Sequence, residues 1–246
     1  MRLAIISDIH GNAFGLQAAL KDLERFSPDQ VVCLGDAIQG GPQPAECVAI
    51  LREKNWPVVM GNADAWLLSG IETGGEITDA QRKKELDDVR EWSLAQLSEA
   101  DKEYISAFQP TITIDLTKNS EVLCFHGSPT SFDEILLPTI ADEDLARVFS
   151  PYEQRAFCGG HTHVQFIRHL KRRIFFNPGS VGFAYRHGQD PSAFRADPWA
   201  EYALLTVGDA EMGLEFRRVG YDVRPLIERY RMCGRPHADA AVKQYS

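Results

Sequence analysis

The sequence predicts a mixed α/β fold, and three observations indicate it. Short apolar runs alternate with amphipathic segments over the first 60 residues, beginning at Arg2 to Ser7 and Val31 to Leu34. Polar residues of metal-binding types directly follow several of these runs. Strand-like runs return after Pro110, whereas residues 65–108 contain none. Alternating strands and helices are typical of parallel pairing with right-handed crossovers.

The first half of the chain predicts helices between its strands. Asn12 is placed to cap a helix whose apolar residues recur at helical spacing: Leu16, Ala19, Leu20, Leu23 and Phe26. A second helix is expected from Pro44 to Lys54, and a strand from Val58 to Met60. Thr78-Asp79-Ala80-Gln81 resembles a capping box, so we expect residues 65–108 to form a helical insertion.

The second half predicts mainly strands, closed by a helix from Asp222 to Met232. Lys171-Arg172 is typical of a hairpin turn. Because no repeat or low-complexity linker interrupts the chain, residues 1–246 are expected to form one domain. The predicted strands are Thr111 to Leu116, Val122 to Phe125, Ala156 to Cys158, Gln165 to Leu170, Arg173 to Phe176, Tyr202 to Val207 and Gly213 to Arg218.

Composition excludes several classes of protein. A formal charge of −9 argues against a broad nucleic-acid-binding surface, although a small phosphorylated ligand stays compatible with it. Met1-Arg2 runs straight into an apolar strand, and no apolar run approaches membrane-spanning length, so neither a signal peptide nor a membrane partner is expected. A cytoplasmic location is the default expectation. The five cysteines form no Cys-x-x-Cys pair, and the three that shortly precede proposed ligands, Cys33, Cys124 and Cys158, are expected to be small buried apolar residues.

Five short motifs carry the chemistry of the chain, and each follows an apolar run. In an open α/β sheet the carboxyl ends of strands form the ligand-binding edge, so these motifs are expected to meet there. Carboxylate, amide and imidazole groups together suit borderline divalent ions such as Mn, Fe or Zn. The motifs are Asp8-Ile9-His10, Gly35-Asp36, Gly61-Asn62-Ala63-Asp64, His126-Gly127 and Gly159-Gly160-His161-Thr162-His163.

Each motif taken alone has a simpler interpretation. An Asp-x-His after a strand also occurs in turns and helix caps, Gly-Asp is a common turn, and a single histidine is often only hydrogen-bonded. The conjunction of all five in order, with small residues beside the ligands, favours a metal site instead.

The complete set resembles the motif series of the calcineurin-like metallophosphoesterases. Asn177-Pro178-Gly179-Ser180-Val181-Gly182 further resembles a signature of the small prokaryotic, YfcE-like phosphodiesterase branch. The resemblance implies a four-layer α/β/β/α sandwich of two mixed sheets flanked by helices. It also implies two divalent metal ions, with Mn favoured and Fe, Zn or Ni as alternatives.

The resemblance assigns a ligand to each motif position. It implies that Asp8, His10 and His163 hold one ion and that Asn62, His126 and His161 hold the other. Asp36 would bridge the two. A hydroxide that bridges both ions would attack phosphorus in line, which makes Asp36, Asn62 and His126 part of the catalytic apparatus.

Two further groups are candidates for substrate binding. Backbone amides near Gly179 and Ser180 are expected to hold the phosphoryl oxygens. Asn12 either contacts the substrate or only caps the first helix.

The chain departs from the family pattern at Ala63, where many relatives have a histidine proposed as the general acid. Alanine donates no proton, so Asp64 loses its implied role of orienting that histidine and is left as a helix cap. His187, in the loop after the Asn177 motif, is a candidate substitute acid, although a loop histidine is usually only solvated. Its neighbour Arg186 is a candidate for gripping a phosphate.

The sequence therefore predicts a metal-dependent phosphoesterase, with a phosphodiesterase of small phosphodiesters favoured. The alternatives are a phosphomonoesterase or dinucleoside polyphosphate hydrolase that uses the same site and, in another class, a protein-interaction scaffold. The specificity pocket is expected between the helical insertion and the loop from Gly182 to Pro198, which are rich in aromatic residues: Trp66, Phe183, Tyr185 and Phe194. The sequence carries no signal for an oligomeric state.

Overall fold

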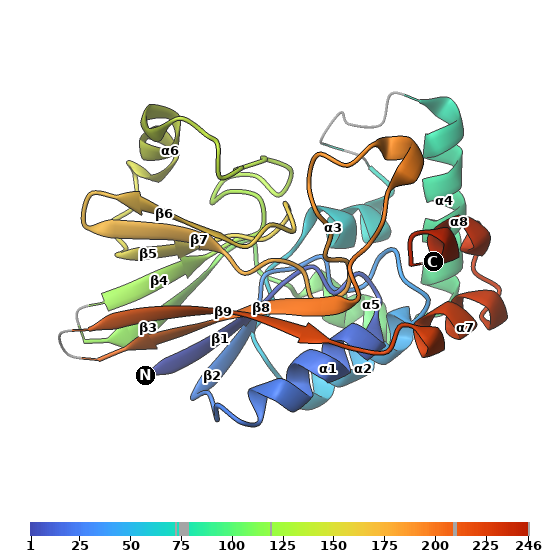
Figure 1. The fold of residues 1–246 in the computed structure, drawn as a ribbon, viewed down its shortest axis with the longest axis horizontal. Helices are drawn as coiled ribbons and strands as arrows, with labels where there is room; N and C mark the ends of the chain where they lie inside the picture. The colour runs from blue at the N-terminus through green and yellow to red at the C-terminus, as the bar shows by residue number, and fades with distance from the viewer. Residues whose placement is uncertain (72, 74–78, 119, 209–210, 246) are drawn as a thin grey trace.

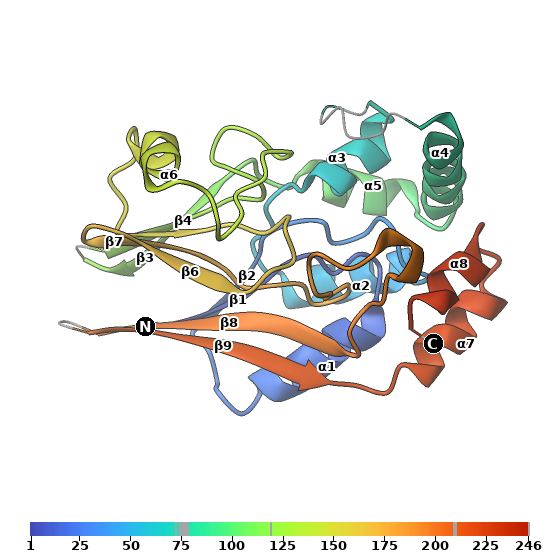
Figure 2. The ribbon, with the colours of Figure 1, turned by 45° about the horizontal axis from the view of Figure 1, so that its top comes forward.

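Two β-sheets packed face to face form the centre of the protein (Figures 1 and 2). The computed structural model describes residues 1–71, 73, 79–118, 120–208 and 211–245. In the first sheet, ordered β2-β1-β8-β9, β1 and β2 are parallel and β8 is antiparallel to both of its neighbours. Its strands are β1 (Arg2–Ile6), β2 (Gln30–Cys33), β8 (Trp199–Val207) and β9 (Met212–Gly220).

The second sheet has the order β3-β4-β5-β7-β6. The three inner strands are parallel, and both edge strands run antiparallel to their neighbours. The predicted turn at Lys171-Arg172 is confirmed, because it joins the antiparallel pair β6 and β7. The strands are β3 (Ile112–Thr117), β4 (Ser120–Cys124), β5 (Ala156–Cys158), β6 (Phe166–Leu170) and β7 (Arg173–Asn177).

Alternation along the strands produces the layers. In β1, Leu3 and Ile5 face the second sheet, whereas Ala4 and Ile6 face the helices outside, because successive side chains of a strand point to opposite faces. The outer helices α1 (Ala13–Leu23) and α2 (Pro44–Lys54) cover the first sheet, and α6 (Asp142–Phe149) covers the second. The predicted four-layer sandwich is therefore confirmed.

Within its described residues, the predicted helical insertion contains three helices: α3 (Asn62–Ser69), α4 (Ala80–Ala95) and α5 (Glu99–Ser106). α3 begins earlier than expected, at a predicted metal ligand. Asp79 caps α4 by accepting a hydrogen bond from the Arg82 N–H, while Thr78 of the predicted capping box lies outside the described residues. Ser98 and Asp101 form an unpredicted capping box at α5.

Other local features also differ from the predictions. Residues 58–60 form no strand; Val58 and Val59 make only isolated bridges, to Cys33 and Gln109, before the chain enters α3. The short helices α6 and α8 (Ala238–Lys243) were not predicted, because each carries only two buried apolar side chains to mark its helical period.

The C-terminal pair formed by α7 (Arg224–Met232) and α8 lies beside α4 (Figures 1 and 2). Leu226 and Tyr230 of α7 pack on Ala241 and Val242 of α8. A hydrogen bond of 3.0 Å between His237 and Asp88 ties this pair to the insertion. This contact brings the end of the chain to the same edge of the sandwich as the metal-binding motifs.

Most of the cysteines are core residues, as predicted. Cys33, Cys47, Cys124 and Cys158 are free and buried within the apolar clusters, and Cys233 is partly buried. No helix within the described ranges combines the length and apolar character needed to span a membrane.

Candidate metal centre

The structure brings the seven predicted ligands together at the strand-exit edge of the sandwich. Each lies at or just beyond the end of an element, because the chain turns there and exposes polar side chains above the sheet. Asp8 and His10 follow β1, Asp36 follows β2, Asn62 opens α3, His126 follows β4, and His161 and His163 follow β5.

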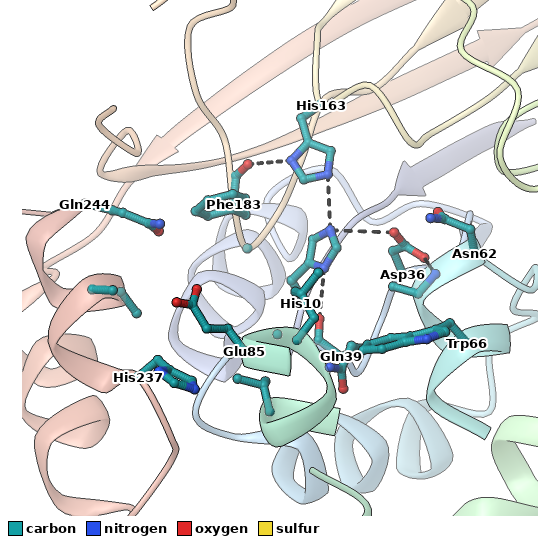
Figure 3. Close-up of a pocket in the computed structure, with 18 of the residues that line it drawn as sticks. His10, Asp36, Gln39, Asn62, Trp66, Glu85, His163, Phe183, His237 and Gln244 are labelled. Carbon is teal, nitrogen blue, oxygen red and sulfur yellow. Dashed lines mark hydrogen bonds and ion pairs between the residues drawn. The ribbon is translucent and has the colours of Figure 1, made fainter. Parts of the chain in front are cut away.

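The first cluster consists of Asp8, His10 and His163, whose ligand atoms lie within 4.8 Å of one another. His10 Nδ1 lies 2.9 Å from the Gln39 carbonyl oxygen and His163 Nδ1 lies 2.6 Å from that of Phe183 (Figure 3). Because a carbonyl only accepts, each Nδ1 donates, and each neutral ring keeps a lone pair on Nε2.

The two Nε2 atoms of that cluster face each other at 3.1 Å. A proton or a metal ion shared by these groups makes this approach favourable. Asp8 Oδ1, buried beside them, lies 3.2 Å from His163 Nε2. Two imidazole nitrogens and a carboxylate oxygen that converge in this way fit a divalent ion as ligands.

The second cluster consists of Asp36, His126 and His161, with Asn62 beside it. His126 Nδ1 donates to the Leu34 carbonyl oxygen, at 2.8 Å. His126 Nε2 then faces Asn62 Oδ1 at 3.0 Å and Asp36 Oδ2 at 3.3 Å. His161 Nε2 is buried and without a partner in the described part of the chain. This second convergence of acceptors also fits a cation.

Asp36 lies between the two clusters. Its Oδ2 is 3.7 Å from His10 Nε2 in the first cluster and 3.3 Å from His126 Nε2 in the second. Its Oδ1 accepts a hydrogen bond of 2.8 Å from the Ala63 N–H, which orients the carboxylate. One carboxylate therefore faces both groups of ligands.

The ligands are held in a strained backbone conformation. Non-glycine residues rarely adopt positive φ, and each instance costs about 1–3 kcal/mol. Hydrogen bonds from the Asp8 N–H to the Gly35 carbonyl oxygen and from the His10 N–H to the Asp36 carbonyl oxygen hold the strained turns in place. The residues with positive φ include Asp8 (54°), His10 (48°), Asp36 (49°), His161 (68°) and His163 (57°).

The pKa values of the histidines and carboxylates in the two clusters depend on how close their opposite charges lie. Burial alone would lower the pKa of His126, but the Asp36 carboxylate outweighs it and raises that pKa to about 10. Burial would likewise lower the pKa of His163, and Asp8 raises it overall. Burial would raise the pKa of Asp36, yet the charge of His126 lowers it well below its usual range.

Metal affinity is therefore expected to rise with pH. Below pH about 10 the metal-free protein holds a proton on His126 that a bound cation must displace, so affinity should increase up to about tenfold per pH unit. The stabilisation that this proton gives the metal-free protein is lost as pH rises through about 10. Manganese titrations by calorimetry, in two buffers of different ionisation enthalpy, measure the protons released. Equal heats in both buffers would contradict the assignment.

Several predicted substrate-binding groups are engaged elsewhere. Gly179 N–H donates to Asn177 Oδ1, and the buried Ser180 hydroxyl donates to the Asp8 carbonyl oxygen, so both stabilise the loop beneath the ligands. Asn12 accepts from the Gly15 N–H as the cap of α1, and its amide donates to the Gly182 carbonyl oxygen and Tyr221 Oη. These groups anchor the site rather than line its cavity.

The candidate substitute acid lies outside the cavity beside the metal centre. His187 is exposed, donates through Nε2 to the Thr162 carbonyl oxygen at 2.6 Å and stacks on Tyr185. Arg186 is exposed as well, and neither residue lines the cavity beside the metal centre. The structure therefore places both side chains outside the cavity, with His187 hydrogen-bonded to the backbone between His161 and His163.

Asp64 has a different role from the predicted helix cap. Its carboxylate accepts hydrogen bonds of 3.1 Å from the Ala37 and Ile38 N–H groups, directly after Asp36. Burial, together with the charge of Asp36, raises the pKa of Asp64 to about 7. Asp64 thus fixes the loop that carries the Asp36 carboxylate.

A cavity of about 440 Å³ opens beside the metal centre. As predicted, Trp66 of the insertion and Phe183 and Tyr185 of the following loop line it, whereas Phe194 packs behind Tyr185 with ring centroids 5.1 Å apart. Sequence reasoning missed the wall built from the C-terminal pair, since only tertiary packing brings it here. That wall includes Tyr230, Arg235, His237, Gln244 and Tyr245.

The four-layer sandwich with clustered metal ligands at its strand ends defines a metal-dependent hydrolase. The sequence model of the calcineurin-like phosphoesterase superfamily domain matches residues 1–201, and the chain belongs to that superfamily. The predicted resemblance is thereby confirmed, and with it the class of metal-dependent phosphoesterases.

Similar proteins span nearly the whole chain. An uncharacterised protein of Methanocaldococcus jannaschii, MJ0912, is 28% identical over 244 residues, which cover 92% of this chain and 90% of that protein. A metallophosphoesterase structure from Sphaerobacter thermophilus is 26% identical, with a TM-score of 0.73 and coverage of 99% and 98%. The PH1004 structure from Pyrococcus horikoshii shares the fold, with a TM-score of 0.82, 20% identity and coverage of 99% and 97%.

Proposed function

We propose that the protein is a binuclear phosphodiesterase that hydrolyses small phosphodiesters. The observation that carries this proposal is the position of Asp36, whose Oδ2 faces a histidine Nε2 in each of two separate ligand clusters. Two ions sharing a carboxylate are the usual apparatus for in-line displacement at phosphorus.

Hydrogen bonds within the chain orient the candidate ligands for this reaction. When bound, two divalent ions supply Lewis-acid stabilisation and an activated water nucleophile. The Nδ1–H bonds of His10, His126 and His163 to backbone carbonyls fix the ring orientations and keep each Nε2 available. Nitrogen and oxygen donors in this mixture support manganese as the preferred ion, with iron, zinc or nickel as alternatives.

The leaving group receives no proton from the third motif. Ala63 lines the cavity at the position of the family's proposed acid, and its side chain donates no proton. General acid catalysis contributes about 10²- to 10⁴-fold, so the absence of a donor here favours esters with good leaving groups. The cavity of about 440 Å³ leaves room for an ester group on either side of phosphorus, which supports a diester rather than a monoester.

Rates on a matched pair of nitrophenyl esters test the proposal. We expect the metal-stripped protein to be inactive and to recover on addition of manganese, with faster turnover of bis(p-nitrophenyl) phosphate than of p-nitrophenyl phosphate. Elemental analysis of the restored enzyme is expected to find two ions per chain. Equal or greater activity on the monoester would favour a phosphomonoesterase, and the absence of both metal and activity would favour a scaffold.

A further inference from the structure

The cavity beside the metal centre has a second polar end. Figure 3 shows Glu85, His237 and Gln244 on the side away from Asp36 and Asn62. This end is formed by α4 and by the C-terminal pair α7 and α8. Its composition differs from that of the metal centre, because it adds the guanidinium groups of Arg82 and Arg235 to the wall.

Among the described residues, one cation at this end of the cavity has no carboxylate partner. Arg82 pairs with Glu85 at 3.6 Å, and His237 contacts Asp88 at 3.0 Å. No ion pair joins Arg235 to a carboxylate anywhere in the described ranges. Arg235 is partly buried, so its guanidinium has lost some of its hydration without gaining a carboxylate partner. This state is unfavourable unless a bound ligand supplies an anionic group.

The Arg235 guanidinium is nevertheless held firmly. Its Nε donates to the Gly40 carbonyl oxygen at 2.8 Å and its Nη1 to the Pro236 carbonyl oxygen at 2.9 Å. The guanidinium also lies over the Tyr230 ring, 5.4 Å from its centroid. These contacts leave Nη2 without a hydrogen-bond partner among the described residues, on a side chain that lines the cavity.

Arg235 is also close to the metal ligands. Gly40, which accepts its hydrogen bond, packs against His10, since a Cβ built on Gly40 would lie 3.6 Å from His10 Nδ1. Burial lowers the pKa of the Arg235 guanidinium without removing its charge at neutral pH. A ligand held by the metal centre can therefore extend along the same wall to Arg235.

We propose that Arg235 forms an oxyanion-binding subsite, so that the substrate carries a second phosphate or carboxylate group beyond the scissile ester. This inference rests on the proposed function, because it takes the scissile phosphorus to lie at the metal centre. A guanidinium with a fixed orientation is well suited to a phosphate or carboxylate, which it recognises through charge-assisted hydrogen bonds. The subsite determines specificity and takes no part in the bond-breaking step.

Three diesters that differ only at the distal group test the subsite. They are ethyl, 2-carboxyethyl and 2-phosphonoethyl p-nitrophenyl phosphate, each with a single scissile bond. We expect one or both anionic compounds to have a KM about tenfold to a hundredfold below that of the ethyl compound, with similar kcat. The carboxylate and phosphonate arms show which oxyanion the subsite prefers.

Substitutions at Arg235 test whether this side chain causes the difference in KM between the anionic and the ethyl diesters. Arg235→Met is expected to abolish the KM advantage while leaving kcat on the ethyl compound within about twofold, since no bond-breaking contact is lost. Arg235→Lys should retain part of the advantage, because it keeps the charge but not the planar fork. Arg231→Met, an exposed change on the neighbouring helix, is the matched control and should behave as wild type.

Binding measurements separate this inference from the proposed function. Calorimetry uses analogues in which a methylene group replaces the oxygen of the scissile bond, so no hydrolysis is required. Equal KM and equal binding across the three compounds in the wild type would overturn the subsite and leave the phosphodiesterase proposal intact. Arg235-dependent binding without hydrolysis of any diester would support the subsite and overturn the phosphodiesterase proposal.

Discussion

Replacing Asp36 by asparagine is expected to lower phosphoesterase activity by about a thousandfold or more. Asp36 Oδ2 is the only carboxylate oxygen that lies within 4 Å of a histidine Nε2 in both ligand clusters, as far as the described residues show. Asparagine keeps the shape and tolerates the φ of 49° at this position, which alanine does not. The change therefore removes the bridging charge without adding backbone strain.

Metal content and activity of Asp36→Asn are measured together. We expect fewer than two bound ions per chain and a melting temperature of the metal-free protein close to that of the wild type. Asp115→Asn, an exposed change on β3, is the matched control and should retain both ions and full activity. Full activity of Asp36→Asn would show that one ion suffices, and the binuclear mechanism would have to be abandoned.

Replacing Gly61 by alanine is expected to damage the same centre without touching a ligand. A Cβ at Gly61 would lie 2.1 Å from Asp36 Oδ1 and 2.2 Å from the Asp36 backbone nitrogen. The bridging carboxylate or the start of α3, which carries Asn62, must then move. A displacement of about 1 Å is enough to cost a hundredfold in rate, and overpacking costs about 1–3 kcal/mol in stability.

The glycine control isolates this steric effect. Gly213→Ala in β9 introduces the same methyl group, but nothing lies within 4 Å of its Cβ, so activity and melting temperature should be unchanged. For Gly61→Ala we expect about a hundredfold lower kcat and weaker metal binding. Wild-type kinetics in that variant would mean that the packing of α3 against Asp36 is not needed for the reaction.

The candidate metal ligands could be predicted because each lies in a short local motif. Asp8 and His126 each come two residues after a strand and Asp36 comes three residues after one, and the carboxyl ends of neighbouring strands lie at one edge of a sheet. A short sequence pattern therefore placed ligands from distant parts of the chain in one site. Several of these residues adopt an unfavourable positive φ in that arrangement, and hydrogen bonds between adjacent loops hold them in it.

The substrate-binding predictions depended on contacts that sequence patterns do not encode. Asn12 and Ser180 are residue types that bind ligands or anchor loops equally well, and the structure shows them anchoring loops. His187 is near the ligands in sequence, yet its loop carries it outside the cavity wall. Arg235 is far from the motifs in sequence, yet its guanidinium hydrogen-bonds Gly40 beside His10.

The sequence by itself determined the alternation of strands and helices and the series of polar motifs at the strand ends, and the resemblance that those motifs carry implied the sandwich, the superfamily and the ligand set. The alternation and the motifs are properties of short segments, because they depend on apolar residues along strands and on polar residues at strand ends. Only the tertiary structure decided what surrounds the centre. The packing of α7 and α8 beside α4 builds the far wall of the cavity, and that wall depends on contacts between residues more than 100 positions apart, such as His237 and Asp88.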